Sequence, residues 1–275
     1  MSGLTLVFGL FFYVSLAIFL GGFLGKIWQY ASTPAPLKIP QTPAPVTAGG
    51  VGIRYLQEVF VFKSLFKGNK LLWVGGYLFH LGLLFVLVEH LRFIIVPTSS
   101  ILNSLVAFDL YSGFVLLAAL VFLFILRVAV DRHAYISLVN DYLLLLLLMG
   151  IAGTGLLSRF WSGGHIRAHI PEIKAFVGGL VTFHNIGAVP TNKLFLIHFS
   201  LVMLLLIYFP FSKLMHAGGI FFSPSRNQVD NPRERRWTTP WVKVRPTATL
   251  PRLEREAAAA PVQAAQAAPE STAEA

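Results

Sequence analysis

Long apolar runs with few charges recur along the chain and are separated by polar or basic segments. A helix needs about 20 apolar residues to cross a hydrocarbon core of about 30 Å, and each run approaches that length. The five runs are Leu4–Leu24, Leu71–Val96, Leu105–Leu126, Tyr142–Leu157 and Leu194–Phe211. They predict an all-α integral membrane protein built as a bundle of five transmembrane helices. The fourth run is the shortest, and we expect its flanks to complete it.

The first run is expected to stay in the mature protein. It is longer than the apolar region of a signal peptide, and no basic segment precedes it. Of the 22 Lys and Arg residues, 17 fall between the first two runs, between the third and fourth, or after the fifth. Because cytoplasmic loops are enriched in Lys and Arg, the amino terminus is predicted outside and the carboxyl terminus in the cytoplasm. We expect a multi-pass protein of a prokaryotic inner membrane.

The segments outside the runs differ in character. Within the predicted cytoplasmic linker 26–70, the stretch Pro34–Gly52 is rich in Pro and Gly and is expected to be non-helical. The stretch Ile53–Phe66 mixes apolar and basic residues, as an interfacial helix on the inner leaflet does. The chain therefore divides into a membrane domain, a basic cytoplasmic docking tail and an Ala- and Pro-rich disordered tail, at residues 1–216, 217–246 and 247–275.

Composition supports a membrane protein. Charged residues make up 12% of the chain, against about 25% in soluble domains, which argues against a free cytosolic enzyme. The net charge of +10 would suggest nucleic acid in a soluble chain, but in so apolar a chain it favours a membrane, and no nucleic-acid partner is expected. The absence of Cys excludes cysteine-ligated iron–sulfur clusters, thiolate zinc sites and covalent c-type haem from this polypeptide.

Four of the eight histidines lie within or beside the second and fifth runs. His80 and His90 are ten residues apart, about 15 Å along a helix, and His198 and His216 are eighteen residues apart, about 27 Å. Polar side chains at membrane depth usually mark functional positions. Antiparallel packing sets His80 opposite His216 and His90 opposite His198. Because the two steps differ, the fifth helix must tilt or bend, and Pro210 offers a place.

Two stacked bis-imidazole pairs are suitable ligands for two non-covalent haems, whereas structural zinc requires four ligands. Gly75, Gly76 and Gly82 are expected to let a porphyrin approach the backbone. The alternative is that these histidines only form hydrogen bonds between helices, and that His216 is a juxtamembrane residue. The other four histidines are expected in surface loops, three of them in a long outer loop over 160–190: His133, His165, His169 and His184.

The two histidine spacings and the five-helix plan resemble the gamma subunit of respiratory nitrate reductase and its relatives, over residues 1–220. The resemblance implies that His80 and His216 hold the iron of a cytoplasmic-side haem b. It also implies that His90 and His198 hold the iron of an outer-side haem b. Within the family, the segments 141–160 and Met215–Trp241 look most like the M subunit of the membrane complex associated with dissimilatory sulfite reductase.

That branch implies an electron-transfer subunit, rather than a stand-alone enzyme, between the quinone pool and a cytoplasmic iron–sulfur subunit in dissimilatory sulfur metabolism. Because this chain lacks Cys, the clusters must belong to the partner. The linker and tail are the expected docking surface, and the alternative for each is a basic charge that only contacts the membrane surface. The alternatives are the gamma subunit of a nitrate reductase-type complex, a proton-relaying transporter and a purely structural anchor. The pattern leaves open whether the quinone is menaquinone or ubiquinone.

Quinone chemistry needs a proton donor or acceptor near a haem edge. Glu89 and Arg92 flank His90, and Asp109 and Tyr111 begin the next helix on the same predicted outer side. These four residues are candidate quinone contacts. Arg92 could instead pair with a haem propionate or extend to the interface, and Glu89 and Asp109 could be helix-end carboxylates near it.

Overall fold

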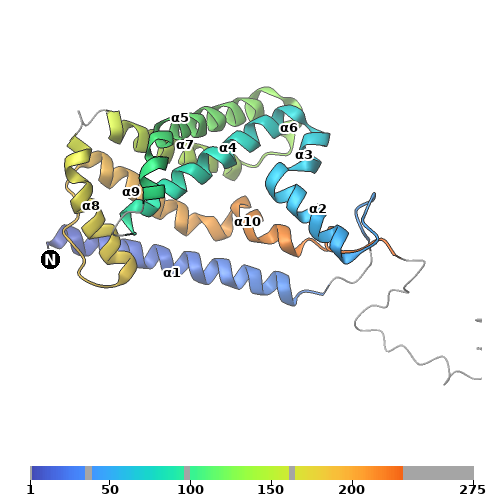
Figure 1. Cartoon of the computed structure of the whole chain (residues 1–275), viewed down its shortest axis with the longest axis horizontal. Coiled ribbons are helices and arrows are strands. Elements are labelled where there is room, and N and C mark those ends of the chain that lie inside the picture. Colours follow the sequence, from blue (N-terminus) through green and yellow to red (C-terminus); the bar gives the residue numbers. More distant parts are fainter. Residues whose placement is uncertain (1, 35–38, 96–99, 161–164, 232–275) are drawn as a thin grey trace, which may run out of the picture.

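The computed structural model describes residues 2–34, 39–95, 100–160 and 165–231, with residues 100–110, 160 and 165–169 described by their backbone alone. Throughout this described part the chain forms helices and no strand, which confirms the predicted all-α class. Figure 1 shows the long helices lying side by side as a bundle, with shorter helices at its two ends.

Among the described residues, five helices are long and apolar enough to cross a membrane, as predicted. They are α1 (Gly3–Ser32), α4 (Lys70–His90), α5 (Ser100–Ala129), α7 (Val139–Phe160) and α9 (Lys193–Tyr208). The shortest predicted run gains three residues at each end in α7. At 1.5 Å per residue, α7 measures about 33 Å and is long enough to cross.

Glycines set the closest approach between spanning helices. The spans pack in the order α4, α5, α7, α9 and α1, with α4 and α5 in the most extensive contact. Gly75 faces the side chain of Leu123, and Gly82 faces the backbone of Leu116. The expectation that Gly75 and Gly82 receive a porphyrin is therefore wrong, because α5 fills that space. Gly76 lies on another face of α4, towards the preceding short helix.

Gly82→Ala is expected to destabilise the bundle. The added Cβ would lie 3.1 Å from the nitrogen and 3.2 Å from the Cα of Leu116, and this backbone can yield only if α5 moves. Overpacking of this kind costs about 1–3 kcal/mol. Thermal unfolding in detergent should show a lower midpoint. Gly76→Ala is the matched control, since its Cβ would meet its nearest neighbour at 3.7 Å; equal midpoints for the two variants would contradict the close packing.

The region predicted as an outer loop over 160–190 instead contains α8 (His165–Thr182). Its apolar residues Ile173, Phe176 and Leu180 are buried, the last two completely, and Phe176 and Leu180 form a core with residues of α1 and α9. Tyr13 of α1 donates a hydrogen bond to the Leu180 carbonyl at 3.1 Å. The loop prediction is wrong because α8 is amphipathic. Its apolar residues alternate along the sequence with charged ones, so they form no long uncharged run.

The predicted interfacial helix begins earlier than expected and is broken. Its two parts are α2 (Ala48–Val61) and α3 (Lys63–Gly68). Thr47 caps α2, so the prediction that the linker is non-helical is wrong for residues 48–52. The break lies at Phe62, which has a φ of 52°. The buried carboxylate of Glu58 accepts hydrogen bonds from the backbone N–H and hydroxyl of Ser64, and so fixes this corner.

Beyond α9 the chain continues in short segments that turn back onto the linker. They are η2 (Phe209–Phe211), η3 (Lys213–Met215), α10 (His216–Gly219) and η4 (Ile220–Phe222). The N–H of Gln41 donates to the Ser225 carbonyl at 2.9 Å, and that of Asp230 to the Pro45 carbonyl at 2.9 Å. Residues 217–231 therefore fold against the linker, whereas 232–246 and the predicted disordered tail lie outside the described residues.

An aromatic contact joins α2 to the same tail. Tyr55 stacks on Phe221 with ring centroids 6.0 Å apart. Burial raises the pKa of the Tyr55 hydroxyl above its ordinary value, so this side chain stays neutral at physiological pH. The linker and the tail thus form one small folded unit beside the ends of α1 and α4.

Candidate functional site

The fifth span ends near Pro210. α9 stops at Tyr208, η2 contains Pro210, and Ser212 has extended backbone with φ −117° and ψ 174°. The predicted bend at Pro210 is confirmed, but the helix is interrupted there rather than tilted. His216 therefore belongs to the separate short helix α10 and does not continue the helical face of His198. This interruption removes the mismatch between the 15 Å and 27 Å steps expected of straight helices.

The four histidines of the second and fifth runs meet in two pairs. The ring centroids of His80 on α4 and His216 on α10 lie 5.9 Å apart, with ring planes at 77°. Those of His90 on α4 and His198 on α9 lie 6.3 Å apart, with planes at 28°. These are the pairs that antiparallel packing predicts. Since His80 and His90 share one helix, the two pairs are separated by about 15 Å along it.

All four imidazoles are held through Nδ1 by a backbone carbonyl. The Nδ1 to oxygen distances are 2.7 Å for His80 to Gly76, 2.6 Å for His90 to Val86, 3.1 Å for His198 to Ile151 and 2.7 Å for His216 to Lys213. A carbonyl oxygen only accepts, so Nδ1 carries the proton and donates it. The lone pair of each ring is then on Nε2, the arrangement in which a second hydrogen bond orients a metal-binding histidine.

The spacing of each pair fits two imidazoles on opposite sides of one metal ion. A metal to imidazole nitrogen bond is about 2 Å and the ring centre lies about 1 Å beyond, so the two centroids stand about 6 Å apart. Both observed distances agree with this value. Within the described residues, no group of three or more His, Asp or Glu could hold a bare metal ion. Two nitrogens per centre suit haem iron, whose porphyrin supplies the remaining four ligands.

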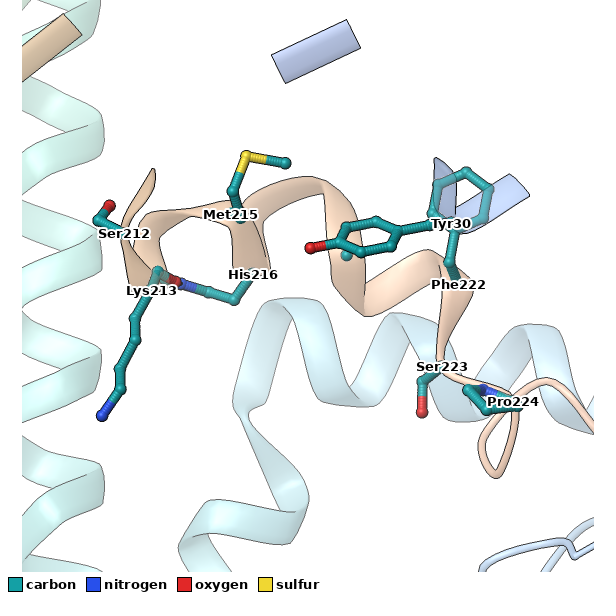
Figure 2. Close-up of a pocket in the computed structure, with 9 residues that line it drawn as sticks. Tyr30, Ser212, Lys213, Met215, His216, Phe222, Ser223 and Pro224 are labelled. Atoms are coloured by element: carbon teal, nitrogen blue, oxygen red, sulfur yellow. The ribbon is translucent and has the colours of Figure 1, made fainter. Parts of the chain in front are cut away.

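A cavity of about 720 Å³ opens beside His216. Figure 2 shows Tyr30 of α1 with its hydroxyl pointing towards the segment that carries Met215 and His216. Apolar walls with a few polar groups are typical of cofactor sites of this size. The apolar lining residues include Met215 and Phe222, and the polar groups are those of Tyr30, Ser212, Lys213 and Ser223.

The corner between α2 and α3 packs against His80. The rings of Phe62 and Phe79 each lie 4.9 Å from the His80 ring, edge to face. The indole N–H of Trp73 on α4 donates to the Val61 carbonyl at 2.8 Å and fastens the corner to α4. The role of Phe62 has no sequence signal, because a positive φ is uncommon for any residue with a bulky side chain.

Glu89 and Arg92 form an ion pair beside His90, with 3.0 Å between Glu89 Oε1 and Arg92 Nη1. The Glu89 side chain is only 5% exposed. The Arg92 guanidinium also lies 5.0 Å from the centre of the Phe93 ring in η1 (Leu91–Phe93), and η1 packs against α8. A buried carboxylate thus lies next to His90, near a helix that the hydropathy pattern did not predict.

Of the other candidates, three have described side chains, and none of these three lies at either histidine pair. Tyr111 is 69% exposed on the surface of the bundle. His133 contacts Asn69, with 3.4 Å between Nε2 and Nδ2, and His184 is exposed after α8. The remaining predicted side chains lie outside those that the structure describes, namely Asp109, His165 and His169.

Asp141, at the start of α7, is a buried charged residue that the sequence pattern did not single out. Its side chain is 6% exposed, and its Oδ2 lies 3.0 Å from Arg127 Nη1 and 2.5 Å from Lys213 Nζ. An acidic residue near membrane depth was the available signal. Asp141 lies one residue before the fourth apolar run, so the hydropathy pattern does not distinguish it from an ordinary acid at a helix end.

Known proteins resemble this chain over most of its length. The family model described as nitrate reductase gamma subunit matches residues 38–231, which include all four paired histidines. An Archaeoglobus fulgidus protein described as Hdr-like menaquinol oxidoreductase cytochrome b-like subunit is 34% identical over 274 residues, covering 83% of this chain and 81% of the relative. A protein of Archaeoglobus profundus with the same description is 31% identical over 289 residues, covering 89% and 84%.

Proposed function

The chain belongs to the nitrate reductase gamma subunit family, and from that membership we propose that it binds two b haems, between His80 and His216 and between His90 and His198. It is a multi-pass cytochrome b of the inner membrane that acts in electron transfer. The observation that carries the two-haem proposal is the geometry of the pairs, with centroids about 6 Å apart and four free Nε2 lone pairs. Haem iron, when bound, supplies reversible one-electron transfer.

The four histidines hold two redox centres at different depths of the bilayer. α4 carries one ligand of each pair, so a single helix fixes the distance between the centres. The carbonyl partners of Nδ1 keep each ring in one orientation and increase the electron donation of Nε2 to a metal. The arrangement suits the passage of electrons from one face of the membrane to the other.

Purified protein is expected to contain two haems per chain. A reduced-minus-oxidised optical spectrum should show b-type haem, and acid acetone should extract all of it, because the chain has no Cys for covalent attachment. A protein without a b-type signal, or with one haem per chain, would contradict the proposal.

The distribution of basic residues supports an orientation with the amino terminus outside. Lys63, Lys67 and Lys70 are exposed on α3 and the start of α4, at the end of the bundle that carries the His80–His216 pair. We place this pair on the cytoplasmic side, and the His90–His198 pair on the outer side.

The substrate proposed is menaquinol, because both relatives are described as menaquinol oxidoreductase subunits. Oxidation of a menaquinol to menaquinone releases two electrons and two protons. Glu89, buried beside His90, is the proposed acceptor of a proton from a quinol hydroxyl, and Arg92 orients its carboxylate through the ion pair. The exposure of Tyr111 on the bundle surface gives it no such support.

The proposed partner is a cytoplasmic iron–sulfur subunit of a complex that acts in dissimilatory sulfur metabolism. The Hdr-like description of the relatives and the lack of Cys in this chain support it. The exposed lysines of α3 and the folded linker–tail unit offer it a docking surface. A nitrate reductase-type partner is the second candidate, and the matching family model favours it. Metal analysis of the affinity-purified complex distinguishes them: iron and acid-labile sulfide without molybdenum supports the first, and molybdenum supports the second.

A further inference from the structure

We propose that Asp141 is a positioning residue for His216 and acts on it through Lys213. This role rests on the proposed two-haem function, since Asp141 would align one of the four histidines that would hold the haems. Asp141 touches neither histidine of the pair. Its effect passes through one residue that contacts both partners, because Lys213 binds the Asp141 carboxylate with its side chain and His216 with its backbone.

Three segments of the chain converge on Oδ2 of Asp141. Arg127 comes from the last turn of α5, Lys213 from η3, and the N–H of Leu138 donates at 3.0 Å. Asp141 lies in the first turn of α7, where the helix dipole favours an anion. Arg127 lies in the last turn of α5, where the helix dipole favours a cation. With the side chain 6% exposed, little water competes for the carboxylate. The cluster is therefore a fixed point among α5, α7 and η3.

The segment that carries His216 needs a contact that fixes its position, because it is not part of a spanning helix. α9 ends before Ser212, so the hydrogen bonds of the spanning helix do not orient η3 and α10. Ser212 caps η3 by accepting from the N–H of Leu214, and Lys213 follows directly. The Lys213 carbonyl then accepts from Nδ1 of His216 at 2.7 Å. Holding the Lys213 side chain against α7 therefore sets where this carbonyl points, and with it the direction of the His216 Nε2 lone pair.

The cluster also sets the charge near this pair. One carboxylate is matched by two cations, so its net charge is +1 while Asp141 is ionised. Replacing the carboxylate by an amide leaves both cations and raises the local positive charge, which favours the reduced form of a nearby iron. The His90–His198 pair lies about 15 Å further along α4 and should respond much less.

Asp141→Asn is the test variant, studied as the purified full-length protein with its haems. Optical redox titration should show a higher midpoint potential and lower occupancy for the haem of the His80–His216 pair, with the other haem unchanged. His80→Ala protein, which is expected to retain only the other haem, identifies which signal belongs to which pair. Asp141→Glu keeps the charge and should return the potential towards that of wild type.

Two further variants separate positioning from general stability. Lys213→Met should lower the occupancy of the same haem, and the double variant with Asp141→Asn should lower it little more than either single variant, because the two residues act in one chain of contacts. The potential of that haem should fall in Lys213→Met and lie near that of wild type in the double variant, whose cluster again has a net charge of +1. Asp131→Asn, an exposed acid in the short helix α6 (Asp131–Tyr135), is the matched control and should behave as wild type.

The outcomes distinguish the two proposals. Wild-type protein without two haems would refute the proposed function. Two haems in wild type, with unchanged potentials and occupancies in Asp141→Asn, would overturn this inference alone. Equal disturbance of both haems by Asp141→Asn, or no effect of Lys213→Met, would also overturn it.

Discussion

Replacing His80 with alanine is expected to lower the haem content from two to one per chain. His80 supplies one of only two protein nitrogens to its proposed centre, and Ala offers no replacement ligand. The His90–His198 pair draws on other turns of α4 and on α9, so its haem should remain. Haem quantified by absorption against protein concentration measures the change, and electron transfer from quinol to a cytoplasmic acceptor should fall to background.

His216→Ala should remove the same haem as His80→Ala, as judged by the spectrum of the one that remains. His90→Ala and His198→Ala should each remove the other haem. His184→Ala changes an exposed histidine after α8 and serves as the control with both haems retained. If any single replacement within a pair left both haems in place, or removed both, the assignment of pairs would be wrong.

Glu89→Gln is expected to slow menaquinol oxidation about 100-fold while both haems remain bound, since positioned proton transfer contributes about 10²-fold to 10⁴-fold. Gln has nearly the same shape as Glu but cannot take up a proton at neutral pH. The steady-state rate with a soluble menaquinol analogue and an artificial electron acceptor measures the effect. Chemical reduction by dithionite should be unaffected, because it bypasses the quinol site.

The control for this variant is Asp131→Asn, which removes an exposed carboxylate from the short helix between α5 and α7. Its rate should equal that of wild type. A wild-type rate in Glu89→Gln would exclude Glu89 as the proton acceptor. Loss of the His90–His198 haem would show instead that the Glu89–Arg92 ion pair has a structural role.

The spanning helices and the histidine pairs could be predicted because both depend on simple periodic rules. Hydropathy over about 20 residues locates a spanning helix, and a rise of 1.5 Å per residue gives the height of each histidine along it. The pairing of His80 with His216 follows from topology, since antiparallel helices place the early residues of one beside the late residues of the other. The interruption near Pro210 also follows, because Pro removes a helical hydrogen bond.

Other features depend on contacts that no local pattern encodes. α8 is buried on one face only, and the charged residues on its other face lower its mean hydropathy below that of a spanning helix. Gly75 and Gly82 could equally have faced a cofactor or a helix, and only the packing of α5 decides between these. One of the two ion-pair partners of Asp141, Lys213, is 72 residues away in sequence. Such long-range ion pairs arise from the way in which the helices assemble.

The interruption after α9 also affects the order in which the two sites can be built. Two residues of the segment after α9 pack against α1: Pro210 contacts Gly22, and Gly218 contacts Ile27 and Phe23. Lys213 reaches back to α7. The His80–His216 site therefore depends on contacts between α1, the first spanning helix, and a segment that is synthesised after α9, the last one. His90 and His198, in contrast, both lie on spanning helices. The His90–His198 site can take shape as α9 enters the bilayer, and the His80–His216 site closes only after the following segment has folded back.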